Sequence, residues 1–180
     1  MKWSSHIEVA CSKAKRILGL LYRRFYGLAD CKTIVQLYLS IVRPHLEYAS
    51  SLWDPHTQKD ISALENVQKF ACKIATKHWN YEYQQLLETC AVPSLAGRRT
   101  KLKLCQLYNI LYGHSYFPQD IFVYSSHHYS TRSHHMVLSR PLAHTNSFLY
   151  SFVPNSISLW NSLSAEQVSA PSLHAFKRLL

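Results

Sequence analysis

The basic residues of this sequence are numerous, and their spacing would allow them to bind a ligand together. The chain of 180 residues has 20 Lys and Arg against 10 Asp and Glu, a formal net charge of +10. Such an excess favours a polyanionic partner, either nucleic acid or an anionic membrane surface. Most of it lies in residues 1–103. The residues expected to contact phosphate are Lys13, Lys15, Arg16, Arg23, Arg24, Arg43, Lys69, Lys73, Arg98, Arg99 and Lys101.

Two of these groups have a recognisable spacing. Lys69, Lys73 and Lys77 repeat every four residues, so on a helix they share one face and repel one another unless solvent or an anion screens them. A solvated face and an anion-binding face both stay open. The second group is a dense cluster at the start of a predicted helix, where it could hold phosphates: Arg98, Arg99, Lys101 and Lys103.

Residue types that carry catalysis or hold metals are poorly arranged for either task. The sequence has no glycine-rich phosphate loop and no nucleophile elbow, and its four aspartates are scattered. The histidines of "HHYSTRSHH" invite a metal hypothesis, but no Cys or acidic residue lies nearby: they are His127, His128, His134 and His135. We therefore expect no catalytic residue, no metal site and no cofactor, and the chain should not be an enzyme.

The five cysteines and the hydropathy bear on the compartment. There is no Cys-x-x-Cys pair and no secretory leader, which predicts reduced thiols in an intracellular protein. Cys11 and Cys72 fall among apolar helical positions and should be buried. No apolar run approaches the roughly 20 residues that span a bilayer, so we expect no stable membrane insertion. The sequence leaves nucleus and cytoplasm open.

Helical periodicity predicts a mainly α fold. Apolar residues recur at spacings of three and four, with basic residues at other angles. Helices are expected over 6–26, over 33–53 with a break, from 60 to 78, over 83–89, after Ser94, over 157–163 and from 172, with Thr33 and Asp60 at helix starts. Alternation at Phe148, Tyr150 and Phe152 predicts a short strand. The expected organisation is a helical bundle over 1–112, a Ser/His-rich loop or linker over 113–146, and a small C-terminal α(+β) module over 147–180.

The stretch "IVRPHLEYASSLWDP", residues 41–55, is interpreted as scaffold. Pro44 lacks a backbone donor and disfavours helix at Arg43, so a helix here must kink or restart. Glu47 is available to hold a basic residue, and the Arg43 guanidinium suits a carboxylate as well as a phosphate. Trp53 should anchor the far end of the bent helix. The full set of expected structural residues is Pro44, Glu47, Tyr48, Trp53, Pro55, Trp160 and Phe176.

Several segments in order resemble one family. The stretches "WSSHIEVACSKAKRILGLLYRRF", "LYLSIVRPHLEYASSLWDP", "DISALENVQKFACKIA" and "VPSLAGRRTKLKLCQLYNILYG" are similar to the region that follows the reverse transcriptase palm in jockey-like non-LTR retrotransposons (LINEs). The stretches "TRSHH", "SFLYSFVPNSISLWNSL" and "SLHAFKRLL" resemble the C-terminal tail of the same polyproteins.

This resemblance implies a helical thumb-like domain of an RNA-directed DNA polymerase, followed by a tail. It implies contacts with the backbone of RNA or an RNA–DNA hybrid, and the polymerase palm as a further possible partner. The family's catalytic Asp-Asp loop has no matching positions here, so the expected fragment is noncatalytic. Two alternatives stay open: a helical protein-interaction module that binds through Trp53, Trp160 or Phe176, and a decayed transposon remnant without function.

Overall fold

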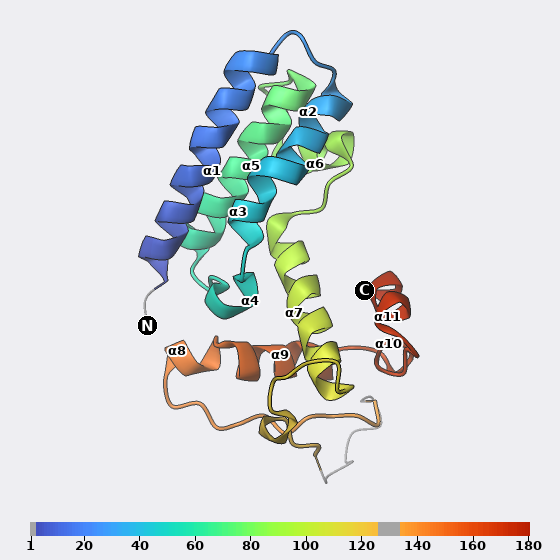
Figure 1. The fold of residues 1–180 in the computed structure, drawn as a ribbon. Helices are drawn as coiled ribbons and strands as arrows, with labels where there is room; N and C mark the ends of the chain where they lie inside the picture. Colours follow the sequence, from blue (N-terminus) through green and yellow to red (C-terminus); the bar gives the residue numbers. More distant parts are fainter. Residues whose placement is uncertain (1–2, 126–133) are drawn as a thin grey trace. The chain divides into compact units, whose positions relative to one another are not determined.

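The computed structural model describes residues 3–125 and 134–180, and its fold is mainly α, as the sequence predicts (Figure 1). The chain forms two units, Met1–Arg99 and Thr100–Leu180. The division falls near the start of one helix, α7 (Leu95–Leu111), rather than at residue 112. The reason is that Leu104, Leu107 and Tyr108 of α7 belong to the core of the second unit.

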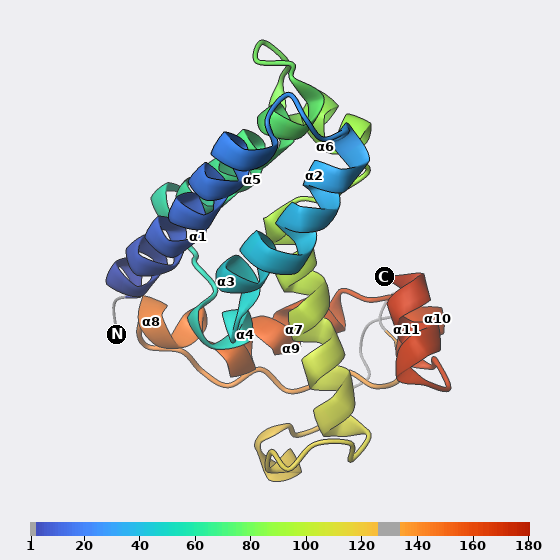
Figure 2. The same cartoon turned by 45° about the horizontal axis from the view of Figure 1, so that its top comes forward.

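Unit 1 is built from two long helices and several short ones. Its elements are α1 (Ser4–Phe25), α2 (Cys31–Leu37), the π-helix η1 (Tyr38–Val42), α3 (Arg43–Glu47), α4 (Ser50–Trp53), α5 (Gln58–Thr76) and α6 (Tyr83–Cys90). In both views α1 and α5 run side by side in the same direction (Figure 1, Figure 2). Helix α2 packs on α5 and touches α6.

The core of unit 1 comes from the apolar positions that the sequence spacing marks out. Ile7, Ala14 and Leu18 of α1 meet Leu64 of α5 and Leu86 of α6, and each of these side chains is almost fully buried. Burial of one large aliphatic side chain contributes roughly 1.5–3 kcal/mol. The hydrophobic face of α1 therefore fixes which of its faces is left to solvent.

The break at Pro44 takes the form of a π-helical turn. The proline ring would clash with the carbonyl of residue 40 in a regular α-helix. One turn earlier the chain widens, and the Arg43 N–H donates to the Tyr38 carbonyl, five residues back. Helix α3 then ends at Glu47, and Ala49 adopts a left-handed conformation with φ of 51°. This turn breaks the apolar face expected to continue through Leu52, which is exposed.

Two helix starts differ from the predictions by one turn. The N-cap of α2 is Asp30, whose Oδ1 accepts from the Thr33 N–H at 3.2 Å, and Thr33 lies inside the helix. The N-cap of α5 is Thr57, whose Oγ1 accepts from the N–H of Asp60 at 3.3 Å. In both helices the sequence offers two candidate caps three residues apart, and the earlier one caps the helix.

Unit 2 contains the rest of α7, a 3-10 turn η2 (Gln119–Ile121), and α8 (Asn146–Leu149), α9 (Phe152–Asn161), α10 (Ala165–Val168) and α11 (Leu173–Leu179). Trp160 and Phe176 are completely buried, and the Phe176 ring stacks on Tyr108 with centroids 4.8 Å apart. Of the described helices, none has the length and apolarity needed to cross a membrane.

The strand expected over 148–152 is wrong, because these residues lie in α8, in the turn after it and at the start of α9. Phe148 and Tyr150 are each 42% exposed, so their alternation does not mark a buried face. Thr145 caps α8 through the Phe148 N–H, and Pro154 lies in the first turn of α9, where a missing N–H is tolerated. In the described part of the chain the β structure is an isolated bridge between Tyr124 and Leu138.

Candidate nucleic-acid interface

The outer face of α1 presents a continuous group of cations. With Ile7, Ala14 and Leu18 buried, the opposite side of the helix faces solvent. Arg16 and Arg23 are seven residues apart, which is close to two turns, so they lie on one line along the helix. The exposed basic residues of α1 are Lys13, Lys15, Arg16, Arg23 and Arg24, called here the α1 basic face.

Among the described residues, no carboxylate is paired with this face. Glu8 is the one acidic residue within α1, and it lies five residues before Lys13. Within residues 3–125 and 134–180, none of the five cations forms an ion pair. Unpaired, solvated Lys and Arg side chains along one helix can follow the phosphates of a nucleic acid backbone.

The lysines of α5 form a second, smaller basic surface. Lys69 and Lys73 are partly exposed, and Lys77 follows the helix with φ of 61° and is exposed. The described residues provide no ion pair to any of the three. Helix α5 ends at Thr76, two residues before its predicted end at His78, so Lys77 lies just beyond the helix.

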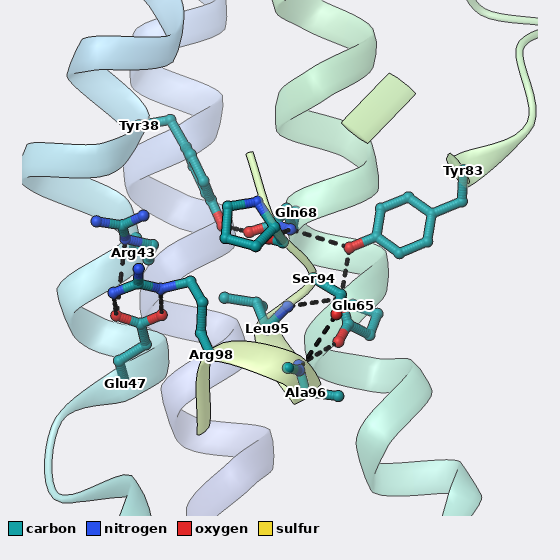
Figure 3. A network of polar contacts seen from close by, with 12 residues as sticks. Tyr38, Arg43, Glu47, Glu65, Gln68, Tyr83, Ser94, Leu95, Ala96 and Arg98 are labelled. Atoms are coloured by element: carbon teal, nitrogen blue, oxygen red, sulfur yellow. Dashed lines mark hydrogen bonds and ion pairs between the residues drawn. The ribbon is translucent and has the colours of Figure 1, made fainter. Parts of the chain in front are cut away.

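Arg98, by contrast, forms contacts within unit 1 that stabilise the fold. Its guanidinium binds Glu47 through two hydrogen bonds, one of them from Nη2 to Oε2 at 3.0 Å (Figure 3). The hydrogen bond to Glu47 is the main cause that raises the pKa of Arg98 above its usual range. Arg43 reaches the same carboxylate, with Nε 3.6 Å from Oε2. Glu47, expected to be available to a basic residue, therefore pairs with both Arg43 and Arg98.

The rest of the cluster at the start of α7 is mostly buried too. Arg99 is 2% exposed, and its Nε donates to Asp54 Oδ1 at 2.9 Å. The Lys103 ammonium, in unit 2, lies 3.1 Å from Asn155 Oδ1, and this lysine is 1% exposed. Lys101 is exposed. Of the predicted phosphate contacts in this cluster, only Lys101 offers its charge freely to solvent.

A polar network fixes the beginning of α7 on α5 (Figure 3). The Glu65 carboxylate accepts from the backbone N–H groups of Leu95 at 3.2 Å and Ala96 at 2.7 Å, and so supplies partners for the free donors of the helix N-terminus. The Tyr83 hydroxyl donates to the same carboxylate. Burial, followed by this hydrogen bond, raises the pKa of Tyr83.

Gln68 is the buried centre of that network. Its Oε1 accepts from the Tyr38 hydroxyl at 2.8 Å, and its Nε2 donates to the Pro93 carbonyl at 3.0 Å and to the Tyr83 oxygen at 3.1 Å. Burial also raises the pKa of Tyr38. Gln68 lies on the buried side of α5 with Leu64 and Ala71, and its partners lie up to 30 residues away in the sequence.

Of the expected scaffold residues, Trp53, Trp160 and Phe176 are buried, Glu47 and Pro55 are partly exposed, and Pro44 and Tyr48 are exposed. Trp53 is 3% exposed, and its Nε1 donates to the Tyr48 carbonyl at 2.8 Å, while the Tyr48 ring itself is exposed. Pro55 follows the end of α4. Trp160 donates through Nε1 to the Met136 carbonyl at 3.0 Å. Trp53, Trp160 and Phe176, the residues named for the protein-interaction alternative, are all buried.

The histidine group has no shared site among the described residues. His134 is buried; its Nδ1 accepts from the Met136 N–H at 3.2 Å, so Nε2 carries the proton and donates to the Trp160 carbonyl at 3.1 Å. His135 is exposed. His127 and His128 lie outside the described residues. In residues 3–125 and 134–180, no three His, Cys, Asp or Glu side chains are grouped as metal ligands.

The cysteines are free thiols. Cys11 and Cys72 are buried, as their spacing predicts. Cys31, Cys72 and Cys90 come together from α2, α5 and α6, and hydrogen bonding between thiols raises the pKa of Cys72 and lowers that of Cys90. A pocket of about 410 Å³ is lined by Cys31 and Cys90 together with Lys32 and Gln36.

One surface was not singled out in the sequence. Exposed rings gather around the ends of α1 and α5, among the basic residues of both helices. The available signal was the interleaving of aromatic and basic residues in "YRRFY" and "KFACKIATKHWNY".

Comparison of the chain with protein-family models, with curated proteins and with solved structures gives no match.

Proposed function

We propose that this protein is a noncatalytic nucleic-acid-binding segment that contacts the backbone of RNA or an RNA–DNA hybrid through the α1 basic face. The observation that carries the proposal is the presence of five exposed cations on one helix without a carboxylate partner in the described residues. In the same unit, the basic residues that stabilise the fold, Arg98 and Arg99, are paired with carboxylates.

The physical basis of such binding is the release of counterions from the phosphates. Each phosphate neutralised by Lys or Arg increases the magnitude of the salt slope, the decrease of log affinity with log salt, by about 0.9 on a duplex and about 0.7 on a single strand. The affinity should therefore fall steeply with salt and show little base preference, because backbone contacts carry no sequence information.

The sequence resemblance gives this binding a biological setting. We propose that the chain corresponds to the thumb-like and C-terminal region of a non-LTR retrotransposon reverse transcriptase, acting inside the cell and without polymerase activity of its own. A mainly α unit with a basic outer helix is compatible with a grip on template and primer. The polymerase palm is the protein partner that this setting implies.

The proposal is tested by fluorescence anisotropy with labelled RNA hairpin, RNA–DNA hybrid and DNA duplex from low to physiological salt. The test variant removes three charges from α1: Lys13→Ala, Arg16→Ala and Arg23→Ala. We expect binding by the unmodified protein, and a salt slope that is lower by roughly 2–3 in the variant.

The matched control removes three exposed charges from unit 2 by Arg140→Ala, Lys177→Ala and Arg178→Ala, and its slope should change much less. Circular dichroism establishes that all three proteins are folded. Absence of binding by the folded, unmodified protein at low salt would overturn the proposal. Equal losses in both variants would show a general charge effect in place of a site on α1.

A further inference from the structure

The end of unit 1 where α1 and α5 both finish carries a group of exposed rings. In both views these two helix ends lie near each other (Figure 1, Figure 2). The exposed fraction is 37% for Tyr26, 39% for Phe70, and 41% for both Trp79 and Tyr81. Large aromatic rings bury much apolar area when they are covered, so four half-exposed rings at one place indicate a surface that receives something.

The rings form a connected set across three segments. Tyr22 and Tyr26 of the α1 end have centroids 4.5 Å apart, and Tyr22 lies 6.5 Å from Phe70 of α5. Phe70 is in turn 6.1 Å from Trp79, in the segment after α5. His78 and Tyr81 stack at 4.2 Å with an interplanar angle of 9°. Tyr22, Tyr26, Phe70 and Trp79 therefore form one connected group, and His78 and Tyr81 form a separate stacked pair in the segment that also contains Trp79.

The charge around these rings is positive. The segments 22–28 and 69–81 contain no acidic residue, and their basic residues are Arg23, Arg24, Lys69, Lys73 and Lys77. The acidic residues that border the two segments, Asp30 and Glu82, act at the N-termini of α2 and α6 as a helix cap and in a capping box. The rings are therefore surrounded by cations whose partner is not supplied from either segment.

We propose that this surface, made by Tyr26, Phe70, Trp79 and the adjacent cations, binds single-stranded nucleic acid by stacking unpaired bases on its rings. The proposal rests on the proposed function, since it takes nucleic acid as the ligand and adds which form is bound here. Positive charge with exposed rings is the combination that single-strand-binding surfaces use: cations follow the backbone and rings stack on bases of any sequence.

The same chemistry argues against a duplex at this place. In a duplex the faces of the bases are covered by their stacked neighbours, so a ring on the protein has no base face to contact. A duplex would use only the cations, whereas an unpaired strand uses both cations and rings. A protein or peptide partner would require an acidic surface with apolar residues, and in that case neither nucleic acid in the experiment below would bind.

The experiment follows tryptophan fluorescence during titration with a single-stranded oligouridylate and with an RNA duplex of equal phosphate number. Trp53 and Trp160 are buried and Trp3 is 37% exposed, so Trp3→Phe is made in the background of every variant to leave Trp79 as the exposed reporter. We expect quenching by the single strand and little quenching by the duplex. The variants that lack Trp79 have lost this reporter, so their affinities are measured by fluorescence anisotropy of the same two oligomers carrying a dye. Trp79→Ala should weaken single-strand binding about tenfold and leave duplex binding within about twofold.

Two controls separate stacking from loss of structure. Trp79→Phe keeps a ring and should retain most of the single-strand affinity. Tyr116→Ala removes a fully exposed ring from unit 2 and should have no effect. If neither oligomer binds the folded protein at low salt, the proposed function fails and this inference fails with it. If both oligomers bind with equal affinity and Trp79→Ala changes neither, backbone binding stands and base stacking on this surface is overturned.

Discussion

The basic residues of α1 and those at the start of α7 form the most instructive comparison in this molecule. Both groups stand out in the sequence as dense, and both were expected to contact phosphate. The structure separates them: the α1 basic face is exposed and has no ion pair within the described residues. In the α7 group, Arg98 binds Glu47, Arg99 binds Asp54 and Lys103 lies against Asn155.

The difference comes from where each helix lies with respect to acidic residues. A buried guanidinium costs several kcal/mol unless it is paired, so the fold can place Arg99 inside only with Asp54 beside it. Helix α1 buries Ile7, Ala14 and Leu18 on one side and never has to bury its cations. A dense basic cluster in a sequence is therefore not by itself a binding surface. Whether its cations are available to a ligand depends on how many acidic residues the fold places beside them.

The largest expected effect follows removal of the carboxylate beside the most buried arginine. Asp54→Ala leaves the Arg99 charge uncompensated at 2% exposure, which should lower the free energy of unfolding by about 3–5 kcal/mol. Urea unfolding followed by circular dichroism measures this. Glu88→Ala, which removes an exposed carboxylate of α6, is the matched control and should cost less than about 0.5 kcal/mol. A similar small cost for Asp54→Ala would remove the distinction between the two basic groups.

A smaller effect is expected at Glu47, which is partly exposed. We predict a coupling free energy of about 1–3 kcal/mol between Glu47 and Arg98, because their contact is bidentate and only 12% and 27% of the side chains are exposed. A double-mutant cycle with Glu47→Ala, Arg98→Ala and the double variant measures it. The parallel cycle with Lys101, which has no ion pair in the described residues, should give a coupling near zero; equal couplings would contradict the structural role of Arg98.

The sequence predicted the α1 side of this comparison well and the α7 side poorly. Local periodicity places Ile7, Ala14 and Leu18 on one face, and that alone determines which cations of α1 are exposed. The partners of Arg98 and Arg99 are 51 and 45 residues away, so no local pattern contains them. Glu47 was recognised as available to a basic residue, but the sequence could name only its neighbour Arg43.

The fold shows the same limit. Periodicity predicted the long helices, and Pro44 predicted a break, but the π-helical form of the break depends on how the chain relieves the clash with residue 40. The left-handed conformation at Ala49 is not predicted from the sequence, because the residue is not a glycine. After this turn Leu52 lies exposed outside the core. The prediction of a strand over 148–152 was wrong because alternation of apolar residues indicates a strand only where one face is buried, and the sequence does not show which face is buried.

The pH dependence of unit 1 should reveal the network that holds the start of α7. Burial raises the pKa of Tyr38 and Tyr83 above the value of about 10 for an unfolded tyrosine. A pKa raised in the folded state contributes stability that is fully present below about pH 10 and is lost as the pH rises from there toward the folded pKa. We expect a fall in the free energy of unfolding above pH 10, measured by urea titrations at several pH values.

The control for this alkaline loss is Tyr38→Phe with Tyr83→Phe. This double variant is less stable at neutral pH, because Gln68 and Glu65 lose hydroxyl partners, but it should show a shallower decline above pH 10. An unchanged decline would place the alkaline sensitivity elsewhere in the chain and would weaken the role given to this network.

The smallest expected effect on stability is on α1, and it is the one that joins the comparison to function. Arg16→Ala and Arg23→Ala remove solvated charges without an ion pair in the described part of the chain, so each should change the free energy of unfolding by no more than about 0.5 kcal/mol. The same urea titration used for Asp54→Ala measures this. A loss of 2 kcal/mol or more would mean that these arginines serve the fold, as Arg98 does, and would remove the argument that they are kept for a ligand. A negligible loss, combined with a lower salt slope of nucleic acid binding, is the pattern that a binding surface alone produces.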